Sequence, residues 1–285
     1  VEGEGEPEIE WGQDVFYKDW EGNPLKGPVS GYPAPELGPE DYNNYEFAPS
    51  RIILWVANQQ HLYFGSFVLA VPIFCMLIEF IGIRVREEDP VMAEKYDRLA
   101  KDLMKVSLTA YSWTAILGGI LLFTFITLFP GFFKYMAGIF RPVMHVYALM
   151  FLAESGVLYV YYYGWDKMKD DTFLKWIHCS LSVLLNLIGT VLMYLANSWA
   201  TFMQAPGGID SEGRFLGNIW HVIHSTLWNP VGVHRILGNI VFGGGIVGAY
   251  AAYHYLTAKN EEERAHYDWV CYVAMFICIF GLIPL

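Results

Sequence analysis

The chain has 285 residues, of which 54% are hydrophobic, 17% aromatic and only 16% charged, with a formal net charge of −11. Soluble domains carry about 25% charged residues, so this composition favours a membrane protein, and the aromatic content excludes a disordered chain. The acidic balance excludes nucleic-acid binding, because phosphate contacts need clustered Lys and Arg. The four cysteines form no CxxC pair, which argues against a disulfide scaffold and a zinc site.

The negative charge is concentrated at the N-terminus. Residues 1–50 hold twelve acidic residues and two lysines, whereas residues 51–285 are almost neutral. The segment is rich in Pro and Gly, which disfavours a long helix, yet it also carries several Trp and Tyr residues. We interpret 1–50 as an extended acidic arm that packs on a partner surface outside the membrane. A solvated tail is the alternative.

Residues 51–285 are predicted to form an all-α integral membrane bundle of about six transmembrane helices. A bilayer core needs about 20 apolar residues per helix, because lipid offers no partner for unpaired backbone polar groups. The charge-poor stretches place the predicted spans at about 52–80, 106–130, 138–165, 175–202, 232–257 and 267–285. The last of them is close to the lower limit of length.

The orientation follows from the Lys and Arg residues of the connections. Eleven lie in the connections after the first, third and fifth spans, and seven lie on the opposite side, two of them in the arm. This bias predicts a multi-pass protein of the bacterial inner membrane with a cytoplasmic first connection. The N-terminal arm is then periplasmic.

Ionisable side chains inside predicted spans are costly and mark functional sites. His61 lies in the first span, His145 in the outer part of the third, and His178 in the inner part of the fourth. Neutral imidazole is a common metal ligand, and a helix bundle can hold a haem between facing side chains. We interpret His61 as a ligand of haem iron, with His145 and His178 as weaker candidates. For each, a histidine hydrogen-bonded between helices is the alternative.

Two further features of the spans have two interpretations each. Glu154, near the middle of the third span, is interpreted as a proton-relay carboxylate kept partly protonated by desolvation; a structural hydrogen bond to a neighbouring helix is the alternative. Gly243–Gly245 and Gly248 remove side chains from the fifth span. Close helix packing is the usual reason, and a flat cofactor lying against the backbone is the other.

Four motifs resemble one family of membrane proteins. Ser50-Arg51 is followed ten residues after the arginine by His61. Further motifs are LMFLAESGVLYVYYYGWD (149–166), LANSWATFMQAP (195–206), and Asn229–Val231 leading to Arg235 and a Gly-rich helix. Between Ser50 and about Tyr255 the chain resembles the N-terminal half of subunit I of cytochrome bd-type quinol oxidases.

The resemblance implies roles for residues within these motifs. His61 matches an axial ligand of the active-site haem pair, and Glu154 matches a glutamate assigned to a proton path. Trp199 and Arg235 lie in the other two motifs, and we include them among the cofactor-binding residues. The chain also departs from the family, since a histidine that binds the low-spin haem falls at Gly238. A second family carboxylate falls near His145.

The predicted function is a haem-containing membrane subunit of a bd-oxidase-like respiratory complex. It would transfer electrons between quinol and another redox site, with haem b as cofactor, quinone as a further candidate ligand, and other membrane subunits as partners in the lipid bilayer. One alternative is an oxygen-reducing quinol oxidase subunit completed by a partner chain. The other is a haem-free scaffold subunit, so the sequence leaves open whether the chain takes part in catalysis.

Overall fold

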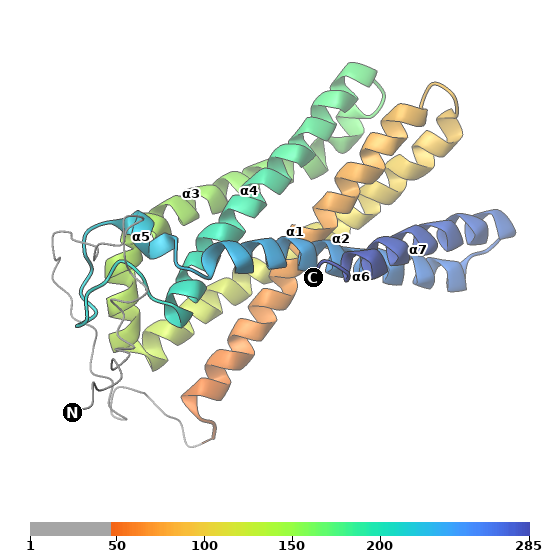
Figure 1. Ribbon diagram of the computed structural model, residues 1–285. Helices are drawn as coiled ribbons and strands as arrows, with labels where there is room; N and C mark the ends of the chain where they lie inside the picture. Colours follow the sequence, from red (N-terminus) through yellow and green to blue (C-terminus); the bar gives the residue numbers. More distant parts are fainter. Residues whose placement is uncertain (1–46) are drawn as a thin grey trace, which may run out of the picture.

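The computed structural model describes residues 47–285, so the predicted acidic arm lies almost wholly outside the described residues. The described part is helical and contains no strand, which confirms the predicted all-α bundle. Its helices, labelled in Figure 1, are α1 (Ser50–Val85), α2 (Pro90–Leu128), α3 (Pro130–Met168), α4 (Thr172–Gln204), α5 (Ile219–Ile223), α6 (Trp228–Thr257) and α7 (Glu261–Gly281).

Five of the described helices are long and apolar enough to cross a membrane: α1, α2, α3, α4 and α6. They overlap the first five predicted spans. The sixth predicted span forms α7, whose first turn carries Glu261, Glu262 and Glu263. These charges shorten its apolar stretch, so α7 is not among the five, and its crossing of the membrane stays a prediction.

N-cap residues explain the short connections before three of the helices. Asp89, Asp171 and Asn260 precede α2, α4 and α7, and each side chain accepts a hydrogen bond from the backbone N–H three residues later, at 2.9, 2.9 and 2.8 Å. Such N-caps satisfy a backbone donor that the helix itself leaves unpaired. The chain can therefore turn back at once, and consecutive helices run antiparallel.

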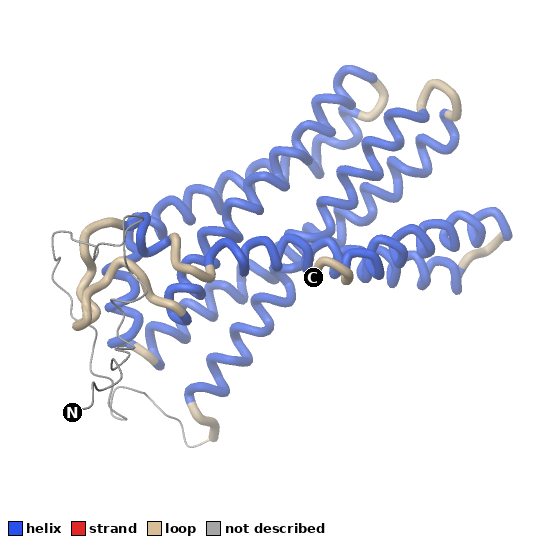
Figure 2. The backbone as a smooth tube through the Cα atoms, in the orientation of Figure 1, coloured by secondary structure: helices blue, strands red, loops and turns tan. Residues whose placement is uncertain are grey.

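The long helices pair into three hairpins, α1–α2, α3–α4 and α6–α7 (Figure 2). Helix α1 lies at the centre, because it contacts α2, α4 and α6. In Figure 1 the turns of the first two hairpins lie at one end of the molecule, and α5 with the connection 205–227 lies at the other. We call the end that carries the turns 86–89 and 169–171 the inner end, after the predicted orientation.

The glycines of α6 are explained by close helix packing. A Cβ atom at Gly243 would lie 2.7 Å from the Phe74 ring of α1, and one at Gly248 would lie 2.9 Å from Met275 of α7. At Gly244 it would lie 2.9 Å from the backbone oxygen of Ala274. These glycines therefore let α6 approach α1 and α7 at once. Side-chain and backbone atoms of those two helices fill the space that a flat cofactor would need.

This packing predicts opposite effects at two adjacent positions. Gly244→Ala should lower the free energy of unfolding by about 1–3 kcal/mol, because the backbone of α7 cannot yield as a side chain would. The matched control is Gly245→Ala, where no atom of residues 47–285 lies within 4 Å of the added methyl group, so that variant should be neutral or stabilised by up to about 1 kcal/mol. Thermal unfolding in detergent measures both. Equal stability of the two variants would contradict the packing argument.

Candidate functional site

A central cavity of about 570 Å³ lies in the half of the bundle away from the inner end, between α1, α2, α3, α4 and α6. Most of its walls are apolar, from residues such as Leu69, Phe125 and Met193. Its volume lies within the range of about 300–1,000 Å³ that is usual for ligand sites lined by apolar side chains with a few polar groups. Four residues predicted from the sequence line it together: His61, Glu154, Trp199 and Arg235.

The imidazole of His61 is held in one tautomer. Its Nδ1 lies 3.1 Å from the backbone oxygen of Thr114 on α2, and a carbonyl oxygen can only accept, so Nδ1 carries the hydrogen and donates it. Nε2 then has a free lone pair, which is the form in which histidine binds a metal. A backbone carbonyl at the other ring nitrogen is also the usual support of a metal-binding histidine, because it fixes the tautomer and the ring orientation.

Glu154 reaches the same cavity from α3. Its side chain is only 5% exposed, and it has no hydrogen bond or ion pair with any residue of the described range 47–285. Gly189 of α4 makes room for it, because a Cβ atom there would lie 3.1 Å from the carboxyl Oε1. The structural alternative, a carboxyl that ties two helices by a hydrogen bond, finds no support within the described residues.

Arg235 and Trp199 give the cavity lining one charged side chain and one aromatic side chain. The Arg235 guanidinium donates a hydrogen bond to the side-chain oxygen of Asn197 on α4 and forms no ion pair with a carboxylate of the described chain. It therefore supplies a half-buried positive charge to the cavity. Trp199 lies on the apolar side, where its ring contacts the phenylalanine rings Phe125, Phe132, Phe133 and Phe140.

The structure does not bring His145 into the cavity. Its side chain is exposed on the outer surface of α3, and Nδ1 lies 2.8 Å from the backbone oxygen of Arg141 in the same helix. An imidazole on this face is available to lipid or to a neighbouring subunit, but it is separated from His61 by its own helix.

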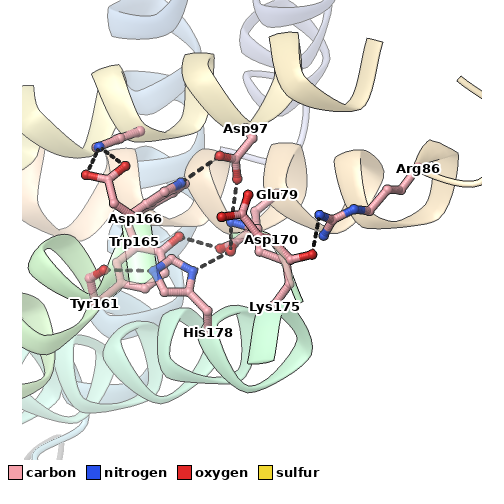
Figure 3. A network of polar contacts seen from close by, with 10 residues as sticks. Glu79, Arg86, Asp97, Tyr161, Trp165, Asp166, Asp170, Lys175 and His178 are labelled. Carbon is pink, nitrogen blue, oxygen red and sulfur yellow. Dashed lines mark hydrogen bonds and ion pairs between the residues drawn. The ribbon is translucent and has the colours of Figure 1, made fainter. Parts of the chain in front are cut away.

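His178 belongs to a second site, a charged cluster at the inner end formed by Glu79, Asp97, Lys175 and His178 (Figure 3). Lys175 lies between the two carboxylates, with its Nζ 2.8 Å from Glu79 Oε1 and in contact with Asp97. His178 uses both ring nitrogens, one on Glu79 and the other 2.8 Å from the backbone oxygen of Tyr161. Neither nitrogen is left for an iron, and we assign His178 to this cluster.

Sequence reasoning missed the other members of the charged cluster. Glu79 falls at the end of the first predicted span, 52–80, and was not singled out, although it is 1% exposed and the cluster around it takes side chains from α1, α2, α3 and α4. A signal was present, because Glu79 is flanked by apolar residues on both sides, in MLIEFIGI, five residues before Arg84. Lys175 and His178 also lie three residues apart on one face of a helix.

The central cavity fits a haem better than a bare metal ion. No group of three or more His, Cys, Asp or Glu side chains that could hold a metal ion occurs among the described residues. Iron in the cavity would therefore have to bring most of its ligands with it, as it does in a haem. His61 would offer one nitrogen to the iron of a haem, Arg235 would offer a positive charge for a carboxylate, and the apolar walls would suit the ring.

A family model describing the cytochrome bd terminal oxidase subunit I matches residues 50–284. The chain belongs to this family. No curated protein matches it in a sequence comparison. As a member of the cytochrome bd subunit I family it is a membrane quinol oxidase subunit, of a kind that generally binds haems, works in a complex with other subunits and resides in the bacterial inner membrane.

Proposed function

We propose that this subunit binds one haem b in the central cavity and passes electrons between quinol and another redox site of a bd-type complex. The observation that carries the proposal is the tautomer of His61, whose free Nε2 belongs to a cavity shared with Glu154 and Arg235. A scaffold that had lost its cofactor would have no reason to keep a buried carboxyl without a partner, since such groups are costly in a membrane.

Each cavity residue has a separate task in this proposal. His61 holds the iron through Nε2, and Arg235 binds a carboxylate of the haem while Asn197 orients the guanidinium. Trp199 and its phenylalanine neighbours keep water from the ring. Glu154 holds or releases a proton at its carboxyl oxygens. The haem itself supplies one-electron chemistry when bound.

Proton transfer matters because quinol oxidation releases two protons with two electrons. A carboxyl group near the cofactor can balance the charge when an electron arrives, since an extra negative charge is costly where no water solvates it. Within residues 47–285, Glu154 is the one carboxyl group that lines the cavity. We therefore assign it the proton-carrying role.

The alternative of an oxygen-reducing subunit completed by a partner chain has one observation in its favour. Gly238, where the family resemblance places a further haem histidine, has no described side chain other than that of Leu285 within 4 Å of where its Cβ would be. A ligand for a second haem would then have to come from another subunit.

A pyridine haemochrome spectrum of the purified subunit tests the main proposal. We expect a haem b signal of about one per chain. Absence of haem b from the subunit and from its complex would overturn the proposal and favour the haem-free scaffold. If haem is present, oxygen uptake is measured with and without the partner subunits. Cyanide-sensitive uptake that requires the partner subunits would favour the oxidase. No such uptake would favour electron transfer alone.

The ring of His61 offers a finer test, because Gly118 lies against it. A Cβ atom at Gly118 would lie 3.0 Å from Cε1 and 3.3 Å from Nδ1 of His61, whereas no atom of the described part of the chain lies within 4 Å of one at Gly119. Gly118→Ala should displace the ring from Thr114 and weaken haem retention by about tenfold, the size of effect found when a metal ligand loses its support. Gly119→Ala should retain haem as the wild type does. Haem loss to apomyoglobin measures both variants, and equal rates would argue against His61 as the ligand.

A further inference from the structure

A water-accessible vestibule leads to the charged cluster from the inner end. It has a volume of about 470 Å³ and lies between the α1–α2 and α3–α4 hairpins. Its rim carries exposed ion pairs and hydrogen bonds, with Lys101 2.7 Å from Asp166 and Arg86 donating to the backbone oxygen of Asp170 at 3.0 Å (Figure 3). Its lining includes the buried Glu79 and Lys175, so water can approach a buried ionisable cluster from this side.

One proton lies between Glu79 and His178. The backbone oxygen of Tyr161 can only accept, so Nε2 of His178 carries a hydrogen and donates it. Nδ1 contacts Glu79 Oε1, and such a contact between two acceptors requires a hydrogen on one of them. The pair is therefore an imidazolium with a carboxylate or an imidazole with a carboxylic acid, and both descriptions contain the same shared proton.

The charges around the pair show why this proton matters. With the proton present, Glu79 and Asp97 are balanced by Lys175 and His178. Without it, one negative charge would remain uncompensated in a buried cluster. The side chains of Glu79, Lys175 and His178 are each at most 5% exposed. The other titratable groups that interact with Glu79 are the Tyr161 hydroxyl, which donates to Oε2 at 2.7 Å, and the thiols Cys75 and Cys179. These groups are neutral and do not replace the missing charge.

A row of polar side chains on α4 lies between the cluster and the central cavity, and its two hydroxyl groups donate to backbone oxygens of the same helix. Beyond His178, the side chains of Ser182, Asn186 and Thr190 follow at intervals of four residues, which place them on one face of the helix. Asn186 also donates to the backbone oxygen of Pro72 on α1 at 3.2 Å, so the row lies between these helices. It ends beside Gly189, the residue that contacts Glu154.

We propose that Glu79 and His178 form a proton-loading site, which takes its proton from water in the vestibule and releases it along α4 toward Glu154. When negative charge arrives in the central cavity, the proton between Oε1 and Nδ1 leaves toward it, and a proton from vestibule water replaces it. Lys175 stays positive throughout and holds both carboxylates. The delivery step rests on the proposed haem function, whereas the loading site itself does not.

The loading site is tested first without reference to haem. Infrared pH titration of the purified subunit, in H₂O and in D₂O, should show one titrating carboxyl–imidazole signal that exchanges with solvent. The signal should be absent from both Glu79→Gln and His178→Gln, and unchanged in Asp166→Asn, the matched control at the vestibule rim. A signal that persists in either cluster variant, or no exchanging signal in the wild type, would overturn the loading site whatever the haem content.

The delivery step is tested with haem-loaded subunit by following proton uptake, with a pH-sensitive dye, after rapid reduction. We expect His178→Gln to slow uptake by about a hundredfold, the usual contribution of a positioned proton-transfer group, while its haem spectrum stays that of the wild type. His145→Gln is the control at an exposed histidine and should take up protons at the wild-type rate. Unchanged uptake in His178→Gln would refute delivery from this site, and a haem-free subunit would refute the proposed function while leaving the infrared result to stand.

Discussion

Replacing His61 with alanine should remove most of the haem from the purified subunit while leaving the helix bundle folded. Among the described residues, His61 is the one histidine that lines the central cavity, and its Nε2 is not the nitrogen that bonds to Thr114. Loss of a hydrogen-bonding partner of a metal ligand already lowers metal affinity by about 10–100-fold, so loss of the ligand should lower it at least as much. The pyridine haemochrome content per chain, compared with the far-ultraviolet circular dichroism, measures haem and fold separately.

The control for this variant is His145→Ala. That imidazole is on the same predicted outer half of the membrane but is exposed, and it bonds to a carbonyl of its own helix. The His145→Ala variant should keep its full haem content. Full haem in His61→Ala would show that another group holds the iron. Loss of haem in both variants would show a general sensitivity of the bundle rather than a ligand.

Lys175→Met should be the most destabilising single substitution at the inner end. The lysine side chain is 5% exposed between Glu79 and Asp97, and its Nζ also lies 4.5 Å from the centre of the Trp165 ring. Removing one partner from a buried ion pair costs about 3–5 kcal/mol, because the remaining charge is left without compensation. Here the methionine would leave two carboxylates with only His178 to balance them.

Lys101→Met is the matched control, at a lysine of α2. Its ion pair with Asp166 is much more exposed, at 31% and 67% for the two side chains, and pairs of this kind contribute at most about 1 kcal/mol. Unfolding by sodium dodecyl sulfate, followed by circular dichroism, gives both free energies. Equal losses in the two variants would mean that solvent reaches Lys175 as freely as it reaches Lys101. Adding Asp97→Asn to Lys175→Met should recover part of the loss.

The helical bundle could be predicted because lipid imposes a simple rule on sequence. A run without charges of about 20 residues must be a helix in a bilayer, and five such runs overlap the five apolar helices. The helix ends could not be predicted in this way. Helix α2 begins at Pro90, well before the predicted span at 106, because its charged first turns are capped by Asp89 and remain helical outside the apolar region.

The central cavity was predictable in part. His61, Glu154, Trp199 and Arg235 each stood out by residue type or by motif, and the structure brings all four together. His178 stood out in the same way but lies in another site, because sequence gives the depth of a side chain in the membrane and not the direction it faces. Glu79 was missed since a carboxylate near the end of a span is normally a solvated flank. Only packing against α3 and α4 buries it.

The pairing of long helices into three hairpins has a consequence for the order in which the protein matures. Contacts within each hairpin join residues close in the chain, and such local contacts form first. The central cavity and the charged cluster instead take their side chains from different hairpins, so neither exists until those hairpins have docked on α1. Under the proposed function a haem could be captured only after this docking, and Lys175 would stay apart from its carboxylate partners on α1 and α2 until then. Docking of the α3–α4 hairpin is thus the step that commits the nascent subunit to its functional form.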